Sequence, residues 1–205
     1  MSASNPNSRL EAFCDGVFAI AITLLILDMK VPPLEKVHST QDLWNNVARL
    51  WPSFFALCLS FTIILIGWIG HHNLIRQVDK TSPLFLFANG FFLFTVIFIP
   101  FPTAFMAEYL NTDYAQPAIV FYCLNGILHN IGWLGLFYSI FKPKLLLRNE
   151  QHYSYIKKSA MQAGYGFFIY VALAVLAWWF PYTALIINVS LWIYWLYVAV
   201  SLKEN

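Results

Sequence analysis

Charged residues are scarce in this sequence. Only 11% of its 205 residues are Asp, Glu, Lys or Arg, whereas 60% are hydrophobic and 19% are aromatic. A soluble domain usually carries about 25% charged residues. The composition therefore excludes an ordinary soluble domain and predicts an integral membrane protein, with the lipid bilayer as its surroundings. The net charge of +2 is too small to indicate a nucleic-acid partner.

Cysteine is also scarce, and its spacing indicates no bridge. Cys14, Cys58 and Cys123 lie in or beside apolar segments without any paired spacing. The pattern therefore predicts neither a disulfide framework nor a metal site of the zinc type. Internal repeats and low-complexity tracts are lacking as well, so residues 1–205 are predicted to form a single transmembrane domain.

Long apolar runs are abundant. Their number predicts an all-α membrane protein with six transmembrane helices, the fifth and sixth joined by a tight turn at Phe180 and Pro181. The first run follows only 12 residues and lacks a small-residue cleavage site, so it is interpreted as part of the mature protein rather than as a signal peptide. The six runs cover residues 13–27, 52–70, 83–106, 118–141, 160–180 and 182–202.

Basic residues predict the orientation of these helices. If the N-terminus is cytoplasmic, nine of the twelve Lys and Arg residues fall on cytoplasmic segments. Cytoplasmic loops of membrane proteins carry an excess of these residues. Both termini are therefore predicted to be cytoplasmic, and the basic cluster from Lys142 to Lys158 is interpreted as a topology determinant.

Two carboxylates bound the first apolar run more closely than a bilayer allows. The uncharged residues 16–27 number 12, which make about 18 Å of helix, whereas the hydrocarbon core is about 30 Å thick. A helix standing alone in lipid would therefore place Asp15 or Asp28 in the hydrocarbon region. Ionisable groups are costly there unless they face protein or water. The first helix is predicted to line a wet space.

One face of this helix carries a narrow stripe. At about 100° per residue, Ile20, Leu24 and Leu27 fall within about 40° of Ile20, and Thr23 lies about 60° to its other side. Phe18 points roughly the opposite way. This cross-section is expected of an inner helix repeated around an axis, although ordinary packed helices show the same pattern.

Asp15 lies about 140° from Ile20, on the opposite side of the helix from the stripe. Its carboxylate is therefore predicted to point into its own subunit, where it needs hydrogen-bond donors. Adjacent residues diverge by about 100°, so His71 and His72 do not share a face. A hydrogen-bond network is predicted here rather than a metal site or a proton relay. The available donors are Arg9, Trp68, His71, His72, Asn73 and Asn89.

The stretch RLEAFCDGVFAIAITLLIL, residues 9–27, resembles the Arg-x-x-x-Phe-Ser-Asp-Gly signature of the transmembrane protein 175 family of potassium channels. The likeness continues in GWIGHHN and ANGFFLFTVIFIPFPT, and the six-segment layout fits the whole chain. A chain with one six-helix unit resembles the bacterial members. The resemblance implies a homotetramer with the first helix lining a central pore, and neither a pore loop nor a TVGYG filter is present.

The resemblance also implies roles for the stripe. Ile20, Leu24 and Leu27 match the apolar constriction of the family, and Thr23 matches a threonine layer that coordinates permeating ions. Asp28, at the outer end of the first helix, could concentrate cations, or it could cap a loop or pair with Lys30.

A second set of residues matches the signature and its network. In the family, this network joins the first three helices by polar contacts. Cys14 departs from the pattern, because serine is usual there and a thiol is a weak hydrogen-bonding group. The set consists of Arg9, Phe13, Cys14, Asp15 and Gly16 with Trp68, His71, His72 and Asn89.

The function implied is passive, weakly to moderately selective conduction of K⁺ across a bacterial plasma membrane, without a cofactor. Weakly hydrated Rb⁺ and Cs⁺ are expected to pass better than Na⁺, because an apolar ring makes the ion shed water without replacing it. The alternative is a proton-coupled secondary transporter, suggested by the histidines, although transporters usually show internal repeats. Enzyme activity is not predicted, because the polar residues of the later segments form no recognisable catalytic set: Asn125, His129, Asn130 and Asn188.

Overall fold

The computed structural model describes residues 7–142 and 150–201. Six of its helical segments are long and apolar enough to cross a membrane, which confirms the predicted count and the all-α class. The helical elements are α1 (Ser8–Leu24), η1 (Leu25–Asp28), η2 (Leu34–Lys36), α2 (Thr40–Arg49), α3 (Trp51–Ile75), α4 (Pro83–Phe98), α5 (Pro100–Tyr109), α6 (Ala115–Phe141), α7 (Glu150–Trp179) and α8 (Pro181–Ser201).

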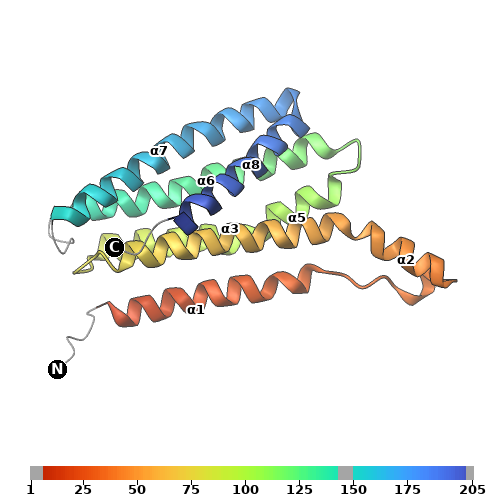
Figure 1. The fold of residues 1–205 in the computed structure, drawn as a ribbon, viewed down its shortest axis with the longest axis horizontal. Coiled ribbons are helices and arrows are strands. Elements are labelled where there is room, and N and C mark those ends of the chain that lie inside the picture. Colours follow the sequence, from red (N-terminus) through yellow and green to blue (C-terminus); the bar gives the residue numbers. More distant parts are fainter. Residues whose placement is uncertain (1–6, 143–149, 202–205) are drawn as a thin grey trace.

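Several helices begin as their first residues dictate. Ser39 and Ser82 cap α2 and α4, their hydroxyls accepting the backbone N–H of Asp42 and Phe85. Both bonds satisfy a donor that the helix itself leaves free. α7 and α8 are separated by Phe180 alone, which confirms the predicted tight turn. The start of α1 and the end of α8 lie toward the same end of the bundle (Figure 1), as an even number of spans requires.

The third span differs from the prediction, because it is broken. α4 ends at Phe98 and α5 begins at Pro100, whereas the apolar run from residue 83 to 106 was expected to form one helix. Pro100 and Pro102 lack the backbone N–H that would continue the hydrogen-bond ladder, so the helix changes direction there. Together the two pieces still form one membrane span of 27 residues.

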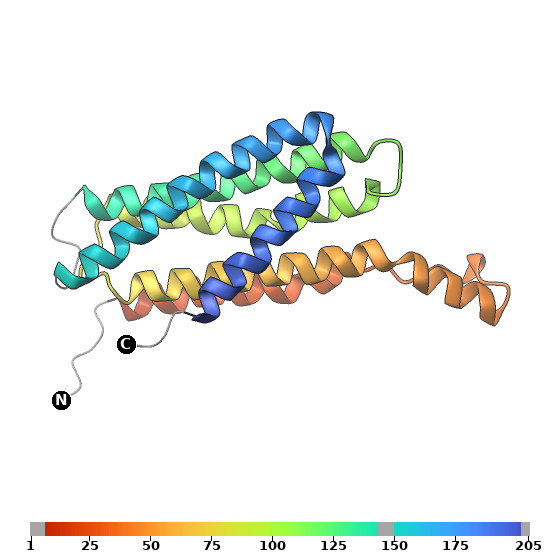
Figure 2. The ribbon, with the colours of Figure 1, turned by 45° about the horizontal axis from the view of Figure 1, so that its top comes forward.

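α6 occupies the centre of the subunit. It packs against α4, α5, α7 and α8, and much of its length is buried. α1 lies at the edge of the helix bundle (Figure 1). Among the described elements, it packs mainly on α3, α4 and the short η1 turn. α2 continues roughly along α3 and extends beyond the bundle (Figure 2). One side of α1 is therefore left uncovered by its own subunit.

Candidate pore face and inter-helix network

α1 has one buried face and one exposed face. Phe18 and Leu25 are 1% and 4% exposed and pack into the core, whereas Ile20, Leu24 and Leu27 are 59%, 53% and 72% exposed. The structure therefore brings the three stripe residues together on the uncovered side of the helix, with Thr23 also exposed.

A tightening of the helix aligns the outer part of the stripe. η1 is a 3₁₀ turn that begins directly after α1, with Leu24 as its N-cap residue. Side chains three residues apart eclipse one another in a 3₁₀ helix, whereas they diverge by about 60° in an α-helix. The side chain of Leu27 therefore lies on the same side of the helix as that of Leu24. Both line a groove of about 460 Å³, together with Ile97 of α4 and Pro100 of α5.

The hydroxyl of Thr23 donates its only hydrogen to the backbone of its own helix. Its Oγ1 lies 2.8 Å from the carbonyl oxygen of Ala19 and 3.1 Å from that of Ile20. A hydroxyl has one donor and two acceptor lone pairs. Because the donor is used within the helix, the exposed side of Thr23 presents an acceptor oxygen, which is the group that a cation requires. Asp28 ends η1, and its side chain lies outside the described part of the structure.

Asp15 points away from the stripe and is held by a tryptophan of α3. The indole Nε1 of Trp68 donates a hydrogen bond of 2.8 Å to Oδ1 of Asp15, and both groups are partly buried. A hydrogen bond from a neutral donor to a carboxylate is stronger than one between neutral groups. It fixes the rotation of α1 about its own axis.

A second chain of hydrogen bonds joins α3, α4 and α1. Asn89 donates from Nδ2 to Sγ of Cys14 at 3.3 Å, and its Oδ1 lies 2.7 Å from Nε2 of His71. Since that amide oxygen can only accept, the proton of this bond belongs to His71. The imidazole also stacks on the ring of Phe92, with centroids 5.4 Å apart. All three hydrogen-bonded residues are buried.

The side chain of His72 contacts a different residue from that of His71. Its Nδ1 lies 3.5 Å from Oε1 of Glu11, which sequence reasoning missed. Glu11 precedes Asp15 by four residues, so the two carboxylates share one side of α1, and this spacing could have indicated it. Asn7 was also missed: its Nδ2 donates to the carbonyl oxygen of Val78 at 2.7 Å and ties the start of α1 to the connection that follows α3.

Several predicted members of the network lie outside it. Arg9, Phe13 and Gly16 are exposed, and Arg9 makes no hydrogen bond or ion pair with any residue that the structure describes. Asn73 contributes only a carbonyl oxygen, which accepts from Gln77 of the same segment. Three of the five signature residues therefore face away from the interior of the bundle. Among the described residues, no group of three His, Cys, Asp or Glu side chains is arranged to hold a metal ion.

The later helices hold a separate buried histidine. His129 lies 3.1 Å from Oγ1 of Thr95 through Nδ1, and its Nε2 accepts a bond of 3.2 Å from the indole of Trp133. Because Nε2 accepts, Nδ1 is the protonated nitrogen and donates across to α4. Both nitrogens of this neutral ring are used, which favours a structural role. On the same helix, Oδ1 of Asn125 is buried without a hydrogen-bond partner among the described residues.

Loss of the Trp68 indole is expected to destabilise the protein. Trp68→Phe removes the donor to Asp15, and hydrogen bonds to charged groups contribute about 1.5–3 kcal/mol. We expect a loss of about 2 kcal/mol, measured as a lower midpoint of thermal unfolding in detergent by circular dichroism. Trp44→Phe is the matched control, because that indole is exposed on α2. Equal midpoints for the two variants would contradict a stabilising Trp68–Asp15 bond.

Substitutions of Cys14 test the chain of hydrogen bonds that joins His71, Asn89 and Cys14. Cys14→Ser keeps an acceptor for Asn89 and is expected to change the free energy of unfolding by less than about 1 kcal/mol. Cys14→Ala leaves the Asn89 amide without its partner and is expected to cost about 1–3 kcal/mol. Cys58→Ala, at an exposed site, controls for cysteine removal. The prediction fails if serine and alanine at position 14 give the same unfolding midpoint.

This chain is similar to several known proteins. The family model described as "Endosomal/lysosomal potassium channel TMEM175" matches residues 9–100, from α1 to the first residue of α5. A potassium channel of Chamaesiphon minutus is 47% identical over 114 residues, which are 56% of this chain and 56% of that protein. The chain thus spans about half the length of the first curated relatives that it matches.

Two further comparisons cover nearly the whole chain. A potassium channel of a Chryseobacterium species is 30% identical over 205 residues, covering 96% of this chain and 98% of that one. The crystal structure of a lysosomal potassium-selective channel TMEM175 homologue from Chamaesiphon minutus superposes with a TM-score of 0.83 at 33% identity, covering 94% and 97%. These relatives are described as channels and not as enzymes. This multi-pass membrane protein belongs to the TMEM175 family.

Proposed function

We propose that this protein is a cation channel that conducts K⁺ passively through a pore lined by α1. The observation that carries the proposal is the uncovered stripe of α1, where Ile20, Leu24 and Leu27 are exposed while the opposite face is buried and hydrogen-bonded. Exposed apolar side chains along one helix face require a partner, either lipid or protein. The names of the bacterial relatives support a pore as the use of this face.

Several copies of α1 are needed to enclose a pore. The proposal is a homotetramer, as the family resemblance implies, with four stripes facing one axis and both termini in the cytoplasm of a bacterial cell. The bonds from Trp68 and Asn89 hold the back of α1 against α3 and α4. They thereby keep the stripe directed toward the axis and out of the subunit interior.

Selectivity follows from the chemistry of the stripe. The rings of Ile20, Leu24 and Leu27 offer an ion no ligands, so the ion that sheds its water most cheaply passes best. K⁺, Rb⁺ and Cs⁺ hold their hydration shells more weakly than Na⁺. Thr23 supplies acceptor oxygens that replace part of the lost water, since its proton is bound to the backbone. Asp28, beyond the last ring, would raise the local concentration of cations.

The proposal is tested by ion flux into proteoliposomes that contain the purified protein. Uptake of K⁺ and Cs⁺ above that of Na⁺, without saturation and without an imposed proton gradient, is the expected result. Saturable uptake that requires a proton gradient would instead support the proton-coupled transporter. Absence of flux for every cation, both in the wild type and in a variant with a widened stripe, would reject the pore.

A further inference from the structure

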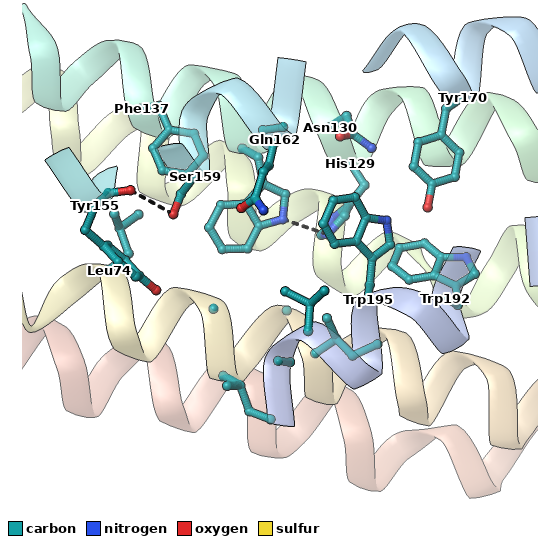
Figure 3. A pocket seen from close by; sticks show the side chains of 18 residues that line it. Leu74, His129, Asn130, Phe137, Tyr155, Ser159, Gln162, Tyr170, Trp192 and Trp195 are labelled. Carbon is teal, nitrogen blue, oxygen red and sulfur yellow. Dashed lines mark hydrogen bonds between the residues drawn. The ribbon is translucent and has the colours of Figure 1, made fainter. Parts of the chain in front are cut away.

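A cavity of about 170 Å³ lies inside the subunit, between α3, α6, α7 and α8 (Figure 3). No residue of α1 lines it, so it is separate from the stripe. Its walls are mainly apolar and rich in aromatic rings, including Trp133, Phe137, Trp192 and Trp195. None of the described residues that line it is Asp, Glu, Lys or Arg.

The cavity exists because α7 and α8 diverge. The two helices meet at Phe180 and then separate, α7 remaining along α6 while α8 crosses toward α3 (Figure 2). Tyr155, near the start of α7, and Gln162, further along the same helix, line the cavity and are partly exposed. His129 and Tyr170 are buried at the closed end. The mouth therefore opens toward the end of the bundle where α1 begins and α8 ends.

A hydroxyl without a partner lies at the closed end. Tyr170 is 1% exposed, and its hydroxyl faces the indole of Trp195 without making a hydrogen bond of full geometry to any described residue. Figure 3 shows this hydroxyl directed into the cavity, toward Trp192 and Trp195. A buried polar group without a partner is destabilising, and native proteins satisfy nearly all of them. The hydroxyl is placed to receive a polar group from a molecule inside the cavity.

Size and polarity limit what that molecule is. An apolar cavity of about 150 Å³ accommodates a benzene molecule, so the available space suits one aromatic ring or a short alkyl segment. A charged ligand would lose its hydration without gaining a counter-charge, which is costly. Water alone would meet mostly apolar walls, and ordered water needs two to four polar partners.

We propose that this cavity is a binding site for a neutral amphiphile that enters between α7 and α8. Its apolar body packs between the rings of Trp133, Phe137 and Trp195, and its hydroxyl or carbonyl group makes a hydrogen bond with Tyr170. The site does not depend on the pore function of α1. Molecules of this chemistry reach the mouth either from the bilayer or from the adjoining aqueous phase.

The probe for the test is 4-bromophenol, added to the protein purified in detergent. Its bromine quenches tryptophan fluorescence at short range and gives an anomalous scattering signal in crystals. We expect a saturable quenching component and a bromine peak inside the cavity. Ala163→Phe fills the cavity from α7 and is expected to abolish both signals. Val175→Phe, an equal addition at an exposed position of α7, is expected to leave them unchanged.

The contribution of the Tyr170 hydroxyl is tested by comparing 4-bromophenol with bromobenzene, which lacks a hydroxyl group. Tyr170→Phe removes one oxygen and is expected to weaken 4-bromophenol binding about fivefold while leaving bromobenzene binding unchanged. Without ligand, the thermal midpoint of this variant should be equal to that of the wild type or higher, because a group without a partner has been removed. The proposal is overturned if the bromine binds outside the cavity, or if Ala163→Phe and the wild type are quenched alike.

The natural source is distinguished by extracting the purified protein and analysing the extract by mass spectrometry. A membrane lipid would be retained by the wild type and lost from Ala163→Phe. A water-soluble amphiphile would be retained by neither protein, and only the added probe would then occupy the site.

Discussion

Leu27→Ala and Ile20→Asn channels are expected to conduct about tenfold more K⁺ than the wild type, equivalent to a barrier lower by about 1.4 kcal/mol. In the proposed tetramer, four copies of either change would act on one ring. Leu27→Ala widens the ring, and Ile20→Asn supplies amide groups that replace part of the ion's hydration shell. Both effects reduce the cost of dehydration, so discrimination against Na⁺ should fall as the current rises.

The measurement is single-channel current in planar bilayers with K⁺ or Na⁺ as the sole cation. Ile193→Ala is the matched control, because Ile193 is also an exposed apolar residue but lies on α8, which packs on α3, α6 and α7. Its conductance and selectivity should equal those of the wild type. Unchanged currents in both stripe variants would show that the constriction lies elsewhere, even if the protein conducts K⁺.

The fold was largely predictable because a membrane imposes a length on every crossing segment. Apolar runs of about 20 residues or more locate the spans directly from the sequence. Hydropathy marks the part of a helix in lipid, however, and not the whole helix. α7 begins at Glu150, ten residues before the apolar run begins, because polar residues such as Lys157 and Lys158 are good helix formers. The break at Pro100 lies within an apolar run, so composition alone did not indicate it.

The directions of Asp15 and of the stripe residues on α1 were predictable, whereas the hydrogen-bond partners of Asp15 were only partly predictable. Arg9, Phe13 and Gly16 are exposed although they were expected in the network. Rotation about one helix places Asp15 opposite Ile20 without knowledge of the rest of the fold. Identifying the donor as Trp68 requires the relative height and tilt of α1 and α3, which no periodicity supplies. The same limit explains why Asn7 was missed, whereas the four-residue spacing of Glu11 and Asp15 could have indicated Glu11. The 3₁₀ turn that aligns Leu27 with Leu24 is a local feature without a distinctive sequence signal.

The interior cavity was not predictable at all from sequence patterns. It arises from the angle between α7 and α8, and that angle depends on how closely each packs on its neighbours. α6 and α7 approach each other closely at Gly126, where an added Cβ atom would lie 2.7 Å from the Tyr170 ring. Gly126 therefore permits the close approach of the Tyr170 ring to α6, and Gly166 of α7 does the same opposite Asn130, where an added Cβ would lie 2.8 Å from Oδ1.

Gly126→Ala is therefore expected to destabilise the protein by about 3 kcal/mol, since overpacking of a closely packed core costs about 1–3 kcal/mol or more. The contact includes Cγ of Tyr170 at 3.2 Å, so rotation of the ring cannot relieve it. Gly135→Ala is the matched control on the same helix, where an added Cβ would meet nothing within 4 Å. That change should stabilise the protein by about 0.5–1 kcal/mol, because alanine loses less backbone entropy than glycine in a helix.

A double variant identifies the cause of the loss. Tyr170→Ala removes the ring with which the added methyl group of Gly126→Ala would clash. The doubly substituted protein should therefore be about as stable as Tyr170→Ala alone, although the losses of unfolding free energy in the two single variants sum to much more. Thermal midpoints in detergent for the four proteins of this cycle give the coupling. Additive losses would mean that Gly126 is required for a reason other than its contact with Tyr170, and the position of α7 would then have to be set by other contacts along α6.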